Sequence, residues 1–158
     1  TKKEFLFIIV GDNSLSNYDK KKLRIKDSNV SNLKELAKEN GVIDNCIFLG
    51  HINNPEDLYP HLNLLIKPTR DNNPWGRDIL EAMIHKIPVV SVGTYNKFVN
   101  DKTGLLMDKF DSEKCAIFIN KIINNKVLSK KLGNNAKNTV QLFCSSNACK
   151  KQYEEFWN

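Results

Sequence analysis

Two short, mostly apolar runs with a polar loop and a helical segment between them limit most strongly what this chain can fold into. The runs span residues 62–66 and 87–92, and short apolar runs are typical of strands buried on both faces of a parallel sheet. Between them, residues 68–76 are polar, and the next segment carries apolar residues at the spacing of one helix face, namely Ile79, Leu80, Met83 and Ile84. The order is strand, loop, helix, strand. Open α/β sheets bind ligands at loops that follow the carboxyl ends of strands, so we predict the binding site at residues 68–76.

The same alternation continues on both sides of this unit. Residues 5–10 predict a further strand, which is expected to be buried, and residues 46–50 and 103–106 predict two more. Leu33, Leu36 and Ala37 mark a helix that Ser31 is expected to cap and Gly41 to end. A short helix is expected to begin at Pro55. We therefore predict an α/β fold: a Rossmann-like parallel sheet flanked by helices, with a helical carboxyl-terminal tail.

The tail is expected to consist of helices only. From residue 111 onward the apolar positions suit one helix near residues 115–123, a second near 128–136 and a third near 148–157. Gly133 is expected to be tolerated in the second helix at some cost in helix stability. Phe156 and Trp157 are expected to serve as core residues or as anchors to another domain rather than to bind a ligand.

The loop itself carries chemistry that suits a polar ligand. Gly76 allows the backbone to approach a ligand closely, and the unpaired amides at the start of the following helix favour polar or anionic groups. Glu81 falls about one turn into that helix, where its carboxylate can accept two hydroxyl groups of one sugar ring. Taken in isolation, the same pattern also fits a solvated Glu81 and a plain turn at Gly76.

Composition and charge exclude several classes of protein. The 158 residues are enough for one domain with its own core, and 41% of them are hydrophobic, as in globular chains. No apolar run has the length of a membrane span, and no signal peptide is visible. The four cysteines form no Cys-x-x-Cys pair and no metal-ligand spacing with the three histidines, so we expect reduced thiols in the cytoplasm and no metal site. The net charge of +6 suits an anionic partner such as a nucleotide diphosphate or a membrane surface, although Lys and Asn are abundant throughout the chain.

The central segment resembles the donor-site motif of retaining glycosyltransferases with the GT-B fold, family 4 in particular. That motif contains Pro-Ser, a variable loop, Glu-Pro-Phe-Gly, a helix with a second Glu before Ala-Met, and a strand that begins with Pro-Val. The counterparts in this chain are Pro68-Thr69, Pro74-Trp75-Gly76-Arg77, Glu81-Ala82-Met83 and Pro88-Val89-Val90. Asn73 stands where the family has its first Glu.

The resemblance extends from Phe5 to about residue 143. Gly11 begins a turn that resembles the family's Gly-Asp-Gly turn, and Thr103-Gly104-Leu105-Leu106 resembles its Thr-Gly-Leu-Leu strand. Gly50 and His51 stand where the family's backbone meets the nucleotide base. His51 is equally readily an ordinary loop histidine.

The resemblance implies a metal-independent enzyme without a cofactor that transfers a sugar from a nucleotide-diphosphate donor with retention of configuration, in glycan or polysaccharide synthesis. Glu81 would hold the ribose hydroxyls, and Arg77 would assist departure of the diphosphate. The amides of Trp75 and Gly76 would hold the sugar together with the side chain of Asn73, the uncertain catalytic position. The remaining donor-binding residues would be Gly11, Gly50 and His51.

The resemblance also implies that the chain is one half of a GT-B fold. We expect residues 1–158 to be a single nucleotide-sugar-binding domain, a fragment that lacks its first strand and the amino-terminal acceptor domain and is inactive by itself. Its partners would be a nucleotide sugar and, through the acceptor domain, a glycan or lipid-linked sugar, with no nucleic acid. The expected location is the cytoplasm, with peripheral association of the full-length protein at the inner face of the membrane left open.

Two alternatives stay open. The first is a degenerate module that binds a nucleotide sugar without turnover, which Asn73 favours, although Asp71 offers a carboxylate two residues earlier. The second is another GT-B enzyme, such as a phosphorylase or a nucleotide-sugar epimerase, which residues 74–77 and 81–83 disfavour. A response-regulator-like fold is disfavoured further, because its acidic phosphorylation pocket is not visible in the sequence.

Overall fold

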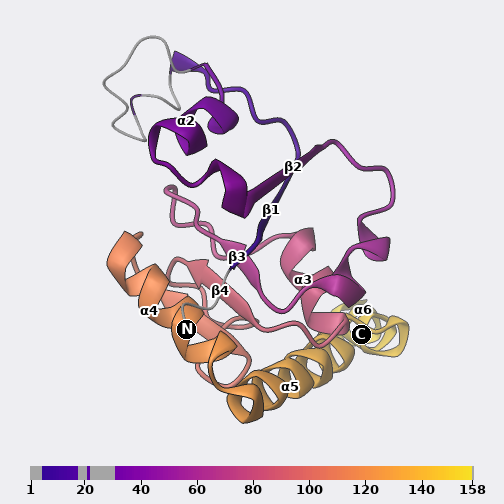
Figure 1. The fold of residues 1–158 in the computed structure, drawn as a ribbon. Helices are drawn as coiled ribbons and strands as arrows, with labels where there is room; N and C mark the ends of the chain where they lie inside the picture. The colour runs from indigo at the N-terminus through magenta and orange to yellow at the C-terminus, as the bar shows by residue number, and fades with distance from the viewer. Residues whose placement is uncertain (1–4, 18–20, 22–30, 158) are drawn as a thin grey trace. The chain divides into compact units, whose positions relative to one another are not determined.

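The structure is a computed structural model that describes residues 5–17, 21 and 31–157. The chain divides into two compact units, Thr1–Pro55 and Glu56–Asn158. Figure 1 labels the helices and strands where there is room. Parallel strands with intervening helices, followed by helices alone, confirm the predicted α/β class. The described strands are hydrogen-bonded as a two-stranded and a three-stranded sheet rather than as one continuous sheet.

The amino-terminal unit pairs β1 (Phe7–Val10) in parallel with β2 (Cys46–Gly50). The strand predicted at residues 5–10 is present, but the prediction that it is buried was wrong, because Phe7 and Val10 are 40% and 43% exposed. Before β2 the chain forms the helix α2 (Leu33–Glu39) and the short 3-10 turn η1 (Ile43–Asn45).

The cap of α2 differs from the prediction by one residue. Asn32 caps the helix by accepting a hydrogen bond from the amide of Glu35 at 3.0 Å. Ser31 instead donates from its own amide and hydroxyl to the Glu35 carboxylate, at 2.6 and 2.9 Å. These bonds resemble a capping box, in which the cap side chain and a Glu three residues later each accept from a backbone amide. The helix ends at Glu39 with Asn40 as its C-cap residue, and Gly41 follows with a φ of 66°, as a glycine after a helix commonly does.

The carboxyl-terminal unit contains a parallel sheet in the order β3 (Leu65–Lys67), β4 (Val89–Val92) and β5 (Gly104–Met107). Two short 3-10 turns, η2 (Pro55–Asp57) and η3 (Tyr59–His61), are found where the sequence predicted one short helix. The strand β3 begins at Leu65, three residues later than the start of the predicted run 62–66. The helices are α3 (Arg77–Ile84), α4 (Ser112–Ile123), α5 (Lys126–Cys144) and α6 (Ser146–Trp157).

Helices cover both faces of this sheet. Val89 packs with Ile79 and Met83 of α3 and with Ala136 of α5 in one apolar cluster. Val90 and Val92 point to the other face and pack in a second cluster with residues of α4 and α5, namely Cys115, Ile122 and Leu132. Every residue of β4 is buried, as expected for a central strand of a parallel sheet.

The last helix contributes little to this core. Phe156 and Trp157 are 79% and 78% exposed, and their rings contact each other with centroids 5.6 Å apart. Their predicted role in the core was therefore wrong for the part of the chain that the structure describes, while the alternative of an anchor to another domain stays a prediction. None of the helices described is long and apolar enough to cross a membrane.

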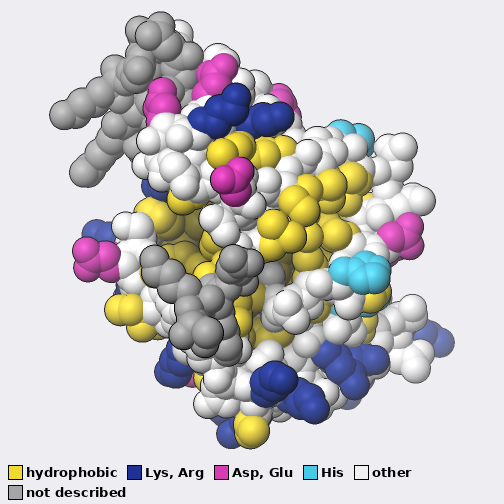
Figure 2. Space-filling view, viewed as in Figure 1, with side chains coloured by type: hydrophobic (Ala, Val, Ile, Leu, Met, Phe, Trp, Pro, Cys, Tyr) yellow, Lys and Arg dark blue, Asp and Glu magenta, His cyan; other side chains and the backbone are white. Residues whose placement is uncertain are grey.

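Much of the positive charge lies on helix surfaces rather than at the predicted loop. In Figure 2, Lys and Arg side chains gather in the lower part of the view, over α5. That helix carries Lys126, Lys130, Lys131 and Lys137. The net charge of the chain therefore does not by itself mark the predicted donor site.

Candidate functional site

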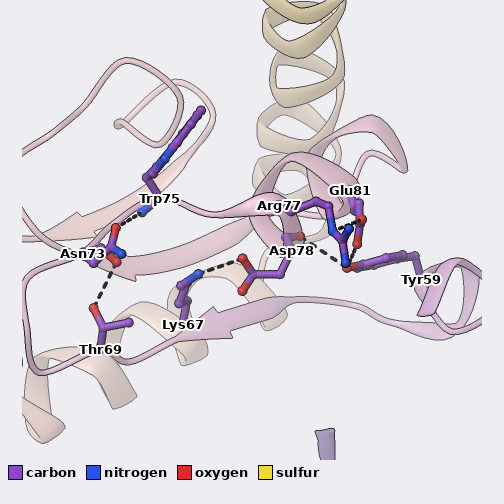
Figure 3. Close-up of polar contacts among 8 residues, drawn as sticks. All are labelled: Tyr59, Lys67, Thr69, Asn73, Trp75, Arg77, Asp78 and Glu81. Carbon is purple, nitrogen blue, oxygen red and sulfur yellow. Dashed lines mark hydrogen bonds and ion pairs between the residues drawn. The ribbon is translucent and has the colours of Figure 1, made fainter. Parts of the chain in front are cut away.

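The predicted binding loop lies where the sequence placed it, at the carboxyl end of β3. Residues 68–76 connect β3 to α3, which begins at Arg77 with Gly76 as its N-terminal cap residue. No side chain caps the amides at the start of α3. Figure 3 shows Asn73 and Trp75 at one end of the site and Glu81 with Tyr59 at the other. The structure thus brings together Asn73, Trp75, Gly76, Arg77 and Glu81 in one unit.

Two of the predicted sugar-binding groups are bonded to each other. The amide of Trp75 donates to the side-chain oxygen of Asn73 at 3.3 Å, and Thr69 Oγ1 donates to the backbone carbonyl of Asn73 at 3.1 Å. Asn72, just before them, has a φ of 56°, a left-handed conformation that asparagine tolerates better than most residues. The bond from the Trp75 amide is longer than a typical N–H···O hydrogen bond and is therefore weak.

Gly76 lies directly beside an ion pair, and its backbone angles do not require glycine. Its φ of 166° and ψ of 165° are extended values that any residue adopts. A Cβ atom at this position would meet Lys67 Nζ and Asp78 Oδ1, which form an ion pair of 2.7 Å directly beside it. This pair was not predicted from the sequence, although the charged Lys67 at the end of the apolar run 62–66 was a signal for it.

The Glu81 carboxylate is held by one donor on each oxygen. Arg77 Nε lies 3.2 Å from Glu81 Oε1, and the Tyr59 hydroxyl donates to Glu81 Oε2 at 2.9 Å. The Arg77 side chain is 88% exposed and that of Glu81 is 33% exposed, so the ion pair is weakened by solvent. Tyr59 is buried against the ring of His85, with centroids 5.4 Å apart. Burial, and then the hydrogen bond to Glu81, raises the pKa of Tyr59 well above its usual range.

Tyr59 is a second residue that the sequence reasoning missed, because only the fold brings η3 beside α3. We expect Tyr59→Phe to lower the free energy of unfolding by about 1 kcal/mol, since it removes a hydroxyl that donates to the partly exposed Glu81 carboxylate. Urea denaturation followed by circular dichroism measures the change. Tyr153→Phe is the matched control, because Tyr153 is 70% exposed on α6. Equal stabilities of the two variants would show that the Tyr59 hydroxyl does not fix Glu81.

The other predicted donor-binding residues belong to the amino-terminal unit. Gly11 follows the end of β1 and Gly50 is the last residue of β2, and the amide of Gly11 donates to the carbonyl of Gly50 at 2.7 Å. Both have positive φ, 106° and 67°, which explains the preference for glycine there. His51 is exposed directly after Gly50. The roles of these three residues stay predictions.

A hollow lies on the Trp75 side of the loop. Its volume is about 390 Å³, and its lining residues are Asn73, Pro74, Trp75 and Tyr95. The Trp75 and Tyr95 rings meet edge to face, with centroids 6.1 Å apart and planes at 78°. Tyr95 comes from the loop after β4 and was not singled out by its sequence.

Charged residues near the loop do not assemble a metal site. In the part of the chain that the structure describes, no three side chains of Asp, Glu, His or Cys come together so as to hold a metal ion. Asp71 is exposed on the loop. The guanidinium carbon of neighbouring Arg70 lies 4.0 Å above the centre of the Phe110 ring, a geometry that favours a cation–π contact.

Sequence comparison connects residues 1–139 with one family, described as glycosyl transferases group 1. The capsular polysaccharide biosynthesis glycosyltransferase CapM of Staphylococcus aureus is 27% identical over 117 residues, which are 72% of this chain and 30% of CapM. The alpha-1,3/1,6-mannosyltransferase ALG2 of Dictyostelium discoideum is 36% identical over 121 residues, 71% of this chain and 28% of ALG2. The chain thus spans less than a third of the length of either relative.

Solved structures support the same fold. HepE of Anabaena, in complex with UDP, superposes with a TM-score of 0.76 at 21% identity, over 96% of this chain and 40% of HepE. HepE is also known in complex with UDP-glucose. The carboxyl-terminal domain of the group 1 glycosyl transferase LpcC from Francisella tularensis matches with a TM-score of 0.59 at 23% identity, over 69% of this chain and 58% of that domain. At these identities the likeness establishes the fold alone.

Proposed function

This chain belongs to the family of group 1 glycosyl transferases, and we propose that it is the donor-binding part of a retaining glycosyltransferase. In this proposal it binds a nucleotide-diphosphate sugar whose sugar is transferred to an acceptor in the synthesis of a glycan or polysaccharide. The observation that carries the proposal is the Glu81 carboxylate, held by Arg77 and Tyr59 one turn into the helix that follows the loop 68–76.

Glu81 is suited to hold the two hydroxyls of a ribose. A carboxylate offers about four acceptor positions, and Arg77 and Tyr59 each use one of them. Tyr59 is buried and fixes the orientation of the carboxylate, whereas Arg77 is 88% exposed and free to turn toward a phosphate. The uncapped amides at the start of α3 add positive potential for the diphosphate.

The sugar would lie at the other end of the loop, at Asn73, Trp75 and Gly76. Replacing the bond between Asn73 and the Trp75 amide by bonds to sugar hydroxyls frees both groups for the ligand. Asn73 is neutral and supplies no negative charge near a developing oxocarbenium ion. In a turning-over enzyme that charge would come from Asp71 or from another part of the protein.

The activity, partners and location of the whole protein are part of the proposal. The chain covers 30% of CapM and 28% of ALG2, and we propose that an amino-terminal domain presents the acceptor, a glycan or lipid-linked sugar. A cytoplasmic location, with peripheral association at the inner face of the membrane, fits such an acceptor. Asn73 favours one alternative, a module that binds a nucleotide sugar without turnover.

Glu81→Gln is the test of the proposed nucleotide site. We expect the substitution to weaken binding by about 1.5–3 kcal/mol, or roughly 10- to 150-fold, because charge-assisted hydrogen bonds to ribose are lost. Isothermal titration with UDP, GDP and ADP in turn measures the affinity. Glu113→Gln, an exposed carboxylate in the first turn of α4, is the matched control and should bind like the parent.

Two further measurements separate the outcomes. Tyr59→Phe removes a bond to Glu81 without removing the carboxylate, so its smaller effect on affinity distinguishes loss of the charge from disturbance of the helix. Measurements of donor hydrolysis and of sugar transfer by the full-length protein then distinguish an enzyme from a binding module. A nucleotide that binds Glu81→Gln and the parent equally would refute the role of Glu81.

A further inference from the structure

We propose that Trp75 and Tyr95 form an aromatic corner that binds a pyranose ring, so that Tyr95 helps to determine which sugar the site accepts. This inference deepens the proposed function and rests on it. The corner joins the loop after β3, which carries Trp75, to the loop after β4, which carries Tyr95. Both residues line the hollow of about 390 Å³ described above.

The Trp75 and Tyr95 rings are partly exposed, but both contact the buried ring of Phe98. Trp75 and Tyr95 are 43% and 49% exposed, and single exposed aromatic residues need no explanation. Here, however, Trp75 lies on Phe98 with centroids 5.0 Å apart, and Tyr95 lies 6.5 Å from the same ring. Phe98 is buried and meets Phe143 of α5 edge to face at 6.3 Å. The corner is therefore anchored to the core and presents apolar surface that is already ordered.

The chemistry of the hollow matches one class of ligand. A pyranose has a polar rim of hydroxyls and flatter faces of C–H groups, which an aromatic ring can cover. The same hollow carries the amide side chain of Asn73 beside the backbone amide of Trp75. Apolar walls with a few placed polar groups are the usual composition of small-molecule sites. A bare phosphate or a metal ion would gain nothing from the two rings.

The position of the corner also fits a nucleotide sugar. In Figure 3, Trp75 and Asn73 lie at one end of the site and Glu81 at the other, with the Lys67–Asp78 ion pair between them. A nucleotide sugar carries its ribose and its sugar at opposite ends of a diphosphate. Ribose at Glu81 therefore directs the sugar toward the corner.

The sugar at the corner could belong to the donor or to an acceptor, and two titrations distinguish them. The chain has two tryptophans, so Trp157→Phe leaves Trp75 as the single reporter when 5-fluorotryptophan is incorporated for fluorine NMR. In this background, UDP-glucose is compared with UDP for the donor. Methyl α-glucoside added with and without saturating UDP tests the acceptor.

We expect the Trp75 resonance to shift with a sugar-bearing ligand, and Tyr95→Ala to weaken that ligand by about two- to tenfold. Binding of UDP alone should stay within about twofold of the parent. Tyr95→Phe should retain the parent affinity, because it keeps the ring. Tyr153→Ala, which removes an exposed tyrosine from α6, should change nothing.

The outcomes for the corner and for the proposed function are separable. If UDP binds in a Glu81-dependent manner but Tyr95→Ala leaves UDP-glucose and methyl glucoside unchanged, the nucleotide site stands and the corner is refuted. If Tyr95→Ala abolishes a glycoside-induced shift while no nucleotide binds, the corner stands and the nucleotide proposal falls. A Trp75 resonance that no sugar-bearing ligand perturbs would likewise overturn the corner.

Discussion

Gly133→Ala is expected to lower the free energy of unfolding of the carboxyl-terminal unit by about 2–3 kcal/mol, within the range of overpacked cores. Gly133 is buried in α5, and a Cβ atom there would overlap the backbone carbonyl of Lys86. A backbone atom cannot rotate away as a flexible side chain does. Lys86 is itself constrained, with a φ of 63° in the turn between α3 and β4. The helix α5 must therefore move away from that turn.

The sign of this effect is diagnostic. Helix propensity alone predicts that replacing glycine by alanine in a helix stabilises it by about 1 kcal/mol. Gly133 lies within α5, as the sequence predicts, and the close approach of α5 to the backbone of Lys86 supplies a reason for glycine there that the sequence does not show. Moving α5 would also loosen Leu132 and Ala136, which are 2% and 0% exposed in the two apolar clusters.

Urea denaturation followed by circular dichroism measures the change, with Asn134→Ala as the control. Asn134 is the next residue of α5 and is exposed, so alanine there should leave stability unchanged or slightly raised. A Gly133→Ala chain at least as stable as the parent would mean that α5 does not pack against Lys86 as closely as the structure has it.

Local pattern and burial explain how much of the fold the sequence predicts. Both faces of β4 are covered, and the run around Val89 is accordingly apolar. This strand can therefore be predicted from the sequence. The run around Phe7 is equally apolar, yet its strand is partly exposed. Apolar composition indicates that a residue can be buried, but the tertiary structure determines which neighbours cover it. For the same reason the sequence alone indicates only that Gly133 is a weak helix former, because it does not show the packing of Gly133 against Lys86.

The same distinction between local sequence and tertiary contacts applies to the candidate site. The motif residues from Asn73 to Glu81 are contiguous in sequence, so their resemblance to a family locates them together on one loop and one helix. Tyr59, Lys67 and Tyr95 reach the site from three other segments, and only the fold reveals their contacts. The bond between Asn73 and the Trp75 amide is also invisible in the sequence. The functional roles of all these residues stay predictions until a ligand is bound.

Gly93 is the position at which a small change should disturb the sugar end of the site most. It follows β4 with a φ of 139°, and a Cβ atom would meet the carbonyl of Asn72 and the ring of Pro74. Its amide donates to the carbonyl of Met107 at 2.6 Å, which fixes it to the end of the sheet. Gly93 therefore cannot yield easily, and the loop that carries Asn72 and Pro74 must move instead.

We expect Gly93→Ala to lower the free energy of unfolding by about 1–3 kcal/mol, from backbone strain and the loop displacement. The fluorine resonance of Trp75 should shift even without ligand, because Trp75 directly follows Pro74. Thr94→Ala is the control, since Thr94 is the exposed neighbour in the same loop. The distinguishing result is a variant that binds UDP like the parent, because Glu81 is held by Arg77 and Tyr59 rather than by Gly93, but no longer distinguishes UDP-glucose from UDP. If Gly93→Ala matches Thr94→Ala in stability and in the Trp75 resonance, the loops after β3 and β4 do not support each other, and the sugar end of the proposed site loses its structural basis.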